Sequence, residues 1–152
     1  MENKMYKKFG LMMFTSFVVM YLLMYINITE WAHWSIATTR IYMSICMISV
    51  MAIVMLLFML SMYKNKIINA IILVGATAAF IISFTMLRNQ TAVSDIAWMR
   101  GMIPHHSSAI MTSENAHLKD PEAQKLANEI IEAQKREIAE MKKMINRLEH
   151  NK

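Results

Sequence analysis

The sequence predicts an all-α protein in which three transmembrane helices precede an antiparallel helical hairpin outside the cytoplasm. Two observations lead to this fold class. More than half of the 152 residues are hydrophobic (56%), and most of them gather into three long apolar runs. The last third of the chain is amphipathic instead, and the pair Asp120-Pro121 divides it into two helical stretches. A chain of this length accommodates a few membrane spans and one short appendage.

Each apolar run is long enough to cross a bilayer, which takes about 20 residues. The runs cover residues 9–28, 41–63 and 67–87, and they define an expected membrane domain at residues 1–87. The first run follows a short basic start, as the apolar region of a signal peptide does. This run is longer than such a region and no small-residue cleavage site follows it, so we expect an uncleaved anchor.

The charges of the connecting loops orient the spans. Lysines precede the first span, and Lys64 and Lys66 flank the tight turn between the second and the third. Lysine-rich loops stay in the cytoplasm, so the loop that carries Trp31 and Trp34 as interfacial anchors faces outward. Everything after the third span then also lies outside. We expect a bacterial inner-membrane protein with a cytoplasmic N-terminus and a periplasmic or extracellular C-terminal domain.

The composition excludes several classes of function. The formal charge of +5 gathers around the membrane segments, whereas residues 88–152 are close to charge balance, so we expect no nucleic-acid partner. Cys46 is the single cysteine, which excludes an intrachain disulfide and a zinc site built from cysteines. The sequence contains no recognisable nucleophile–base pair and no phosphate-binding loop. We therefore do not expect an enzyme.

The second span is rich in sulfur. Its methionines recur every four residues, and Cys46 stands between Met43 and Met47 near the outward end. Sulfur ligands are soft and prefer Cu(I), so these three residues are candidates for a second surface that handles a metal ion. The alternative is that methionine, a flexible apolar residue, fills the membrane interior.

The chain after the third span divides into a linker, residues 88–94, and a helical hairpin, residues 95–152. The first hairpin helix is expected over residues 95–118, after an N-cap serine. Asp120-Pro121 is a start signal for the second helix, because Asp caps a helix and Pro suits its first position. This second helix is expected to run to about Leu148.

The first hairpin helix carries two adjacent histidines close to two methionines. Pro104 directly precedes the histidines, and because proline removes a backbone donor, we expect a kink or a helix restart there. Helical neighbours are three and four residues apart, so Met102 and His106 share one face, with Met99 one turn earlier. Imidazole binds several transition metals and thioethers prefer Cu(I), so this face predicts a site for a soft metal ion. The alternatives are a methionine-rich core with solvated histidines and, for His105, a ligand role towards a second chain.

The second hairpin helix brings polar residues to the level of these ligands. In an antiparallel hairpin with this turn, the numbers of facing residues add to about 240. Three pairs are then level: Met102 with Glu137, His106 with Gln134, and Met99 with Met141. Glu137 and Gln134 interrupt an otherwise apolar face, and their hard oxygen atoms fit Cu(I) poorly. We expect them to accept an imidazole N–H and so to orient the ring.

Two helices cannot enclose a hydrophobic core of their own. Pairing with a second hairpin gives a four-helix bundle, an architecture that holds metal sites between facing helices. Because the chain encodes one hairpin, we expect a homodimer.

Residues 95–148 resemble the family catalogued as domain of unknown function 305, a ferritin-like helical domain of bacterial exported proteins. The shared features are Asp95, Met99, Met102-Ile103-Pro104-His105-His106, Ala109, Ile110, Gln134, Glu137-Ile138-Ala139 and Met141. The resemblance implies periplasmic copper binding and copper tolerance. The ligands that it implies are Met102, His105, His106 and Met141, with Met99 next. Many relatives carry two hairpins in tandem and this chain has one, which again favours a dimer.

The expected function is therefore that of a membrane-anchored, outward-facing protein that binds Cu(I), or Ag(I), contributes to copper tolerance and has a copper-handling protein as its partner. Two alternatives remain open. Glu114 and His117 form a Glu-x-x-His pair, the unit used in di-iron bundles, which would indicate a di-iron or copper oxidoreductase. The other alternative is a metal-free hairpin, tethered to the membrane, that pairs with a partner protein.

Overall fold

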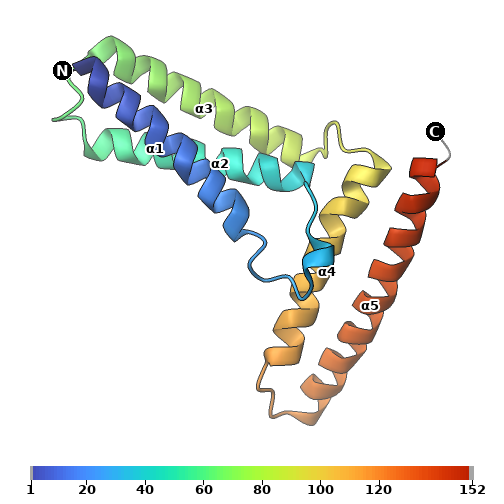
Figure 1. Cartoon of the computed structure of the whole chain (residues 1–152). Coiled ribbons are helices and arrows are strands. Elements are labelled where there is room, and N and C mark those ends of the chain that lie inside the picture. The colour runs from blue at the N-terminus through green and yellow to red at the C-terminus, as the bar shows by residue number, and fades with distance from the viewer. Residues whose placement is uncertain (1, 151–152) are drawn as a thin grey trace. The chain divides into compact units, whose positions relative to one another are not determined.

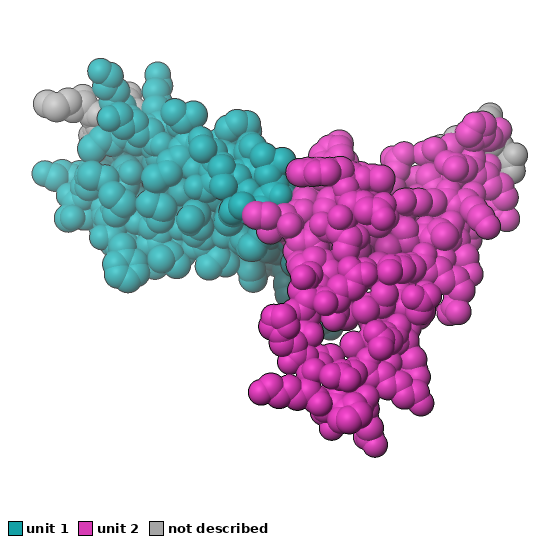
Figure 2. All heavy atoms as spheres, turned by 60° about the horizontal axis from the view of Figure 1, so that its bottom comes forward, with its two compact units in different colours: residues 1–23, 39–92 teal, residues 24–38, 93–152 magenta. Residues whose placement is uncertain are grey.

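The computed structural model describes residues 2–150 and confirms an all-α fold (Figure 1). The described part contains five α-helices, one short 3-10 helix and no strand. Their bounds are α1 Glu2–Leu23, η1 Trp31–His33, α2 Thr38–Phe58, α3 Lys66–Arg88, α4 Asp95–Asn115 and α5 Pro121–His150. The helices form two compact units, which Figure 2 colours separately. The first unit contains α1, α2 and α3, and the second contains α4, α5 and the segment of residues 24–38.

The three helices of the first unit are long and apolar enough to cross a membrane. They offer spans of 20, 21 and 23 residues, namely Lys4–Leu23, Thr38–Phe58 and Lys66–Arg88. At 1.5 Å per residue, each reaches about 30 Å, the thickness of the hydrocarbon core of a bilayer. The third span agrees with the prediction, whereas α1 ends at Leu23 and α2 at Phe58, before the predicted ends at residues 28 and 63.

The early end of α1 has a physical cause in the residues that follow it. Tyr25 is buried, and its hydroxyl donates a hydrogen bond to the Ser35 carbonyl oxygen at 2.6 Å. Tyr25 therefore packs within the segment 24–38, whereas Ile26 is 80% exposed, and neither residue lengthens the span. Hydropathy counts them as membrane residues because it measures composition and not the partners of a side chain.

Hydrogen bonds between helices reinforce the apolar packing of the first unit. The Tyr6 hydroxyl of α1 donates to Asn69 Oδ1 of α3 at 2.9 Å, and the Tyr42 hydroxyl of α2 donates to the Thr91 carbonyl oxygen at 2.9 Å. The buried apolar core of this unit consists of Phe9, Ala52, Leu56 and Tyr63. Directional contacts thus join α1 to α3, and α2 to the turn that follows α3.

The second unit is built on the hairpin of α4 and α5. The Ser94 hydroxyl caps α4 by accepting the Ala97 N–H at 3.3 Å, and Asp120 caps α5 by accepting the Ala123 N–H at 2.8 Å. Both caps agree with the sequence prediction, but α4 ends at Asn115, before the predicted residue 118. The buried core of the hairpin consists of Met99, Ile103, Ile110, Ile131, Ile138 and Met141. Burial of a side chain of this size stabilises by about 1.5–3 kcal/mol.

Helix α4 continues through Pro104 without a break, so the helix restart considered for this position does not occur. Proline lacks the N–H that the Arg100 carbonyl, four residues earlier, would accept. The Ser35 hydroxyl donates to this carbonyl oxygen at 2.6 Å instead. The segment 24–38 thus replaces the hydrogen bond that the proline removes.

We predict that Ser35→Ala weakens the docking of segment 24–38 on α4 by about 1 kcal/mol, because the Arg100 carbonyl loses a hydrogen bond. In a Pro104→Ala background the same change should have a much smaller effect, since residue 104 then has an N–H of its own. Hydrogen exchange of the amides of segment 24–38, measured on the full chain in lipid nanodiscs, gives both values. Equal effects in the two backgrounds would show that the Ser35 hydroxyl does not replace the hydrogen bond that Pro104 removes.

Candidate metal centre

His106 is buried on α4 and is held from both helices of the hairpin. Its Nε2 atom lies 2.7 Å from Glu137 Oε2 of α5, and its Nδ1 atom lies 3.0 Å from the Met102 carbonyl oxygen of α4. Both oxygen atoms are hydrogen-bond acceptors, and a neutral imidazole has one N–H, so its tautomer decides which of the two oxygen atoms receives the hydrogen bond. A metal ion that binds either nitrogen therefore has to replace one of these two contacts.

Three methionine side chains pack in the same interface between α4 and α5. Met99 and Met141 are buried, and Met102 is half-buried against the same cluster. A thioether is a weak acceptor that packs like an apolar group, so the core can hold these sulfur atoms without hydrogen-bond partners. One chain thus brings three soft sulfur ligands and one imidazole to a single helix–helix interface. This donor set suits Cu(I).

His105 lies outside the interface. Its side chain is exposed, and its ring centroid is 6.1 Å from that of His106, with 64° between the ring planes. Successive residues of a helix point about 100° apart, so when one histidine faces α5 its neighbour faces solvent. Within one chain the structure does not bring His105 to the methionines.

Gln134 was expected at the level of His106, but Glu137 makes that contact. The two residues are about one turn apart on α5, so the observed register differs from the expected one by less than a helical turn. Gln134 Oε1 is buried and has no hydrogen-bond partner among the residues that the structure describes. A buried acceptor without a partner costs about 1–3 kcal/mol, so Gln134 does not have the role of imidazole acceptor that the sequence predicted for it.

The Glu-x-x-His pair lies apart from this interface. Glu114 forms an ion pair with Lys135 at 3.2 Å, whereas His117 follows the end of α4 at Asn115 and is exposed. The two residues therefore do not share a helical face. Among residues 2–150, no three histidine, cysteine, aspartate or glutamate side chains gather into a group that could hold a metal ion.

The sulfur-containing residues near the start of α2 have different surroundings. Cys46 Sγ lies 3.1 Å from the Ser83 hydroxyl of α3, whereas the side chains of Met43 and Met47 are exposed. The thiol is engaged with a neighbouring helix, and the two thioethers lie on the surface of the first unit.

The chain is similar to known proteins over most of its length. Residues 82–145 match the family described as Domain of unknown function (DUF305). Uncharacterized protein L153 of Acanthamoeba polyphaga mimivirus is 33% identical over 143 residues, which cover 90% of this chain and 90% of that protein. This chain belongs to the DUF305 family. No solved structure matches it.

The two similarities cover different parts of this DUF305 protein. The family match begins within α3 and ends within α5, so it contains the whole of α4 and the contact between His106 and Glu137. The similarity to the viral protein extends further, because 90% of the chain includes residues of all three membrane helices. The viral relative therefore resembles this chain in both of its units.

A contact that sequence reasoning missed is centred on Ser107, the residue after His106. Ser107 is fully buried, and its hydroxyl oxygen accepts the Thr29 N–H at 2.8 Å. The same oxygen lies 2.9 Å from His33 Nδ1. The segment 24–38 is thus fastened to the DUF305 hairpin beside the candidate metal ligand.

The sequence offers little to predict this contact. The polar residues of the segment that make it are Asn27, Thr29, His33 and Ser35, and the 3-10 helix η1 lies among them. Each of these four residues contacts α4 through a hydrogen bond. Their partners lie 65 to 81 residues further along the chain, so no local pattern identifies them.

The surroundings of His33 favour its neutral form. Burial lowers the pKa of this imidazole below its ordinary value of 6.5, the nearby Lys142 ammonium lowers it further, and the Glu30 carboxylate opposes both. Because the pKa is lower in the docked state, that state binds fewer protons than the released one. The stability that neutral His33 contributes to docking is therefore fully present above pH 6.5. It is lost as the pH falls from this value towards the lowered pKa.

We predict that segment 24–38 loses protection from hydrogen exchange when the pH falls from about 7.5 to about 5. His33→Gln should abolish most of this pH dependence, because an amide does not titrate in this range. The measurement is hydrogen exchange of the full chain, corrected for the intrinsic exchange rate at each pH. His117→Gln, which replaces an exposed histidine, is the matched control and should keep the wild-type profile. Equal protection of the wild type at both pH values would refute the assignment to His33.

Proposed function

We propose that this DUF305 protein is a membrane-anchored copper(I)-binding protein with its hairpin outside the cytoplasm. The observation that carries the proposal is the donor set between α4 and α5. Three thioethers pack in one cluster there, and the His106 imidazole lies in the same interface. Thioether sulfur and imidazole together favour Cu(I) over hard divalent cations. Ag(I), which is also soft and monovalent, is expected to bind the same residues.

The proposed ligands are Met102, His106 and Met141, with Met99 as a further sulfur atom from the preceding turn of α4. Glu137 has a supporting role, since its carboxylate holds the His106 ring at 2.7 Å. Binding of the ion at Nε2 replaces this contact. The Glu137 side chain is 45% exposed, so its carboxylate can then be hydrated and carries no large penalty.

The proposed orientation follows from the lysines and the tryptophans. Lys64 and Lys66 stand where α2 is connected to α3, and the positive-inside rule assigns that connection to the cytoplasm. The connection between α1 and α2 carries Trp31, which is 88% exposed, and Trp34; both are residues typical of a membrane interface. In a bacterial inner membrane, this orientation puts the hairpin in the periplasm. There it contributes to copper tolerance by holding the ion and passing it to a copper-handling protein.

A second copy of the chain is part of the proposal. Two helices leave apolar side chains uncovered, among them Leu126 of α5 at 56% and Trp98 of α4 at 49% exposure. Pairing of two hairpins into a four-helix bundle covers such side chains. It would also give the exposed His105 access to an ion held by the partner chain.

We predict that the full chain in lipid nanodiscs competes with a chromogenic chelator for Cu(I). The double substitution Met102→Leu with His106→Gln should lower the affinity by more than about 100-fold, because two ligands are lost. Met144→Leu is the matched control, since it removes the same sulfur atom from an exposed position of α5. It should leave the affinity unchanged.

Other results of this titration would indicate other functions. An unchanged affinity in the double variant, or an equal loss in Met144→Leu, would refute the ligand assignment. Iron loading with oxygen-dependent turnover would support the oxidoreductase instead. Complete lack of metal affinity would leave a hairpin that acts by pairing with another protein.

A further inference from the structure

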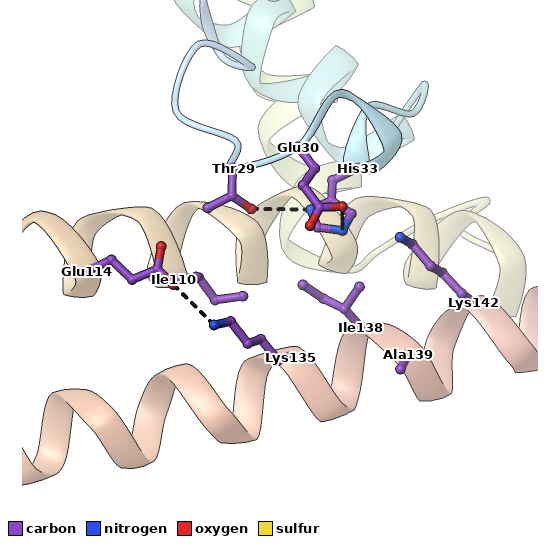
Figure 3. A pocket seen from close by; sticks show the side chains of 9 residues that line it. All are labelled: Thr29, Glu30, His33, Ile110, Glu114, Lys135, Ile138, Ala139 and Lys142. Atoms are coloured by element: carbon purple, nitrogen blue, oxygen red, sulfur yellow. Dashed lines mark hydrogen bonds and ion pairs between the residues drawn. The ribbon is translucent and has the colours of Figure 1, made fainter.

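A cavity of about 460 Å³ lies between the segment 24–38 and the two helices of the hairpin (Figure 3). Pockets that bind small molecules have volumes of about 300–1,000 Å³. None of the proposed copper ligands lines this cavity. A ligand bound here would therefore be a feature of the protein beyond copper binding.

The cavity combines an apolar floor with charged ends. Ile110 of α4 and Ile138 of α5 form the floor, as Figure 3 shows. At one end Glu114 and Lys135 form an ion pair at 3.2 Å and neutralise each other. Lys142 lines the other end, and its ammonium group forms no ion pair with any residue that the structure describes. The cavity thus has one positive charge that a ligand can pair with.

His33 adds a polar group to the wall beside Lys142. The residue is only 6% exposed, and its Nδ1 atom forms a hydrogen bond with the Ser107 hydroxyl at 2.9 Å. Its Nε2 atom lies 3.6 Å from Glu30 Oε2, which is beyond the distance of a good hydrogen bond. Nε2 is therefore left to donate to a ligand. The Glu30 side chain is 66% exposed, so its carboxylate can turn away into water.

We infer that this cavity binds a small organic carboxylate with a short hydrocarbon part. The carboxylate pairs with the Lys142 ammonium and accepts the His33 Nε2–H, and the hydrocarbon part covers Ile110 and Ile138. A single negative charge matches the single unpaired ammonium group, whereas a doubly charged phosphate would leave one charge uncompensated beside Glu30. Glu30 competes with the ligand, because its own carboxylate stands next to the same two groups.

The test uses the full chain in lipid nanodiscs with ¹³C-labelled isoleucine methyl groups and a chelator that removes metal ions. Sodium hexanoate is the probe, and the methyl signals of Ile110 and Ile138 report its binding. Saturable shifts of these two signals are the expected result. Pentanol and pentylammonium have the same five-carbon chain without the carboxylate, and they should bind at least about tenfold more weakly, because a hydrogen bond to a charged group is lost. Equal binding of hexanoate and pentanol would overturn the inference.

Two substitutions with opposite expected effects sharpen the test. Lys142→Met should weaken hexanoate binding at least about tenfold, whereas Glu30→Gln should strengthen it, because the competing carboxylate is gone. Misfolding cannot produce such a gain. Lys143→Met removes the adjacent, exposed lysine, which does not line the cavity, and should change nothing. The inference is wrong if Glu30→Gln weakens binding, or if Lys143→Met and Lys142→Met have equal effects.

Discussion

The docking of segment 24–38 on α4 is the constraint on which the second unit depends. A proline inside α4 leaves the Arg100 carbonyl without its helical partner, and Ser107 is a hydroxyl group with no exposed surface. A buried polar group such as the Ser107 hydroxyl is costly unless it is hydrogen-bonded. The segment satisfies both, through the Ser35 hydroxyl at 2.6 Å and the Thr29 N–H at 2.8 Å. These two contacts flank the stretch of α4 that carries Met102 and His106, so the segment fixes the helix at the candidate metal centre.

The folded hairpin accommodates the thioethers and the imidazole of the candidate centre by different interactions. The thioethers of Met99 and Met141 are part of the apolar core, where burial stabilises the fold. The imidazole of His106 is polar and needs partners, and it has them in Glu137 and in the backbone of its own helix. Soft ligands can thus be kept together in the core without a large electrostatic penalty. Carboxylates in the same place would repel one another, and the hairpin would then need the bound ion in order to fold.

Local signals in the sequence predict part of this structure well. The caps Ser94 and Asp120 and the start of α5 follow from side chains that bond to neighbouring amides, and the contact between α4 and α5 follows from a short turn and helical geometry. The end of α1 could not be predicted, because the residues after Leu23 are mostly apolar, yet Tyr25 packs within the segment 24–38 and bonds to Ser35. The contact of His33 with Ser107 joins residues 74 positions apart, and nothing local specifies it. The sequence left open whether α4 is continuous at Pro104 or restarts there, because the hydrogen bond that the proline removes is replaced by a distant serine.

The central claim is that thioether sulfur and imidazole nitrogen from the interface of α4 and α5 bind one soft ion. X-ray absorption spectroscopy of the full chain loaded with one equivalent of Cu(I) tests this claim most directly. We predict a first coordination shell of mixed sulfur and nitrogen, and a loss of sulfur scattering in Met102→Leu. A shell of nitrogen and oxygen alone, or sulfur scattering that Met102→Leu leaves unchanged, would contradict the claim.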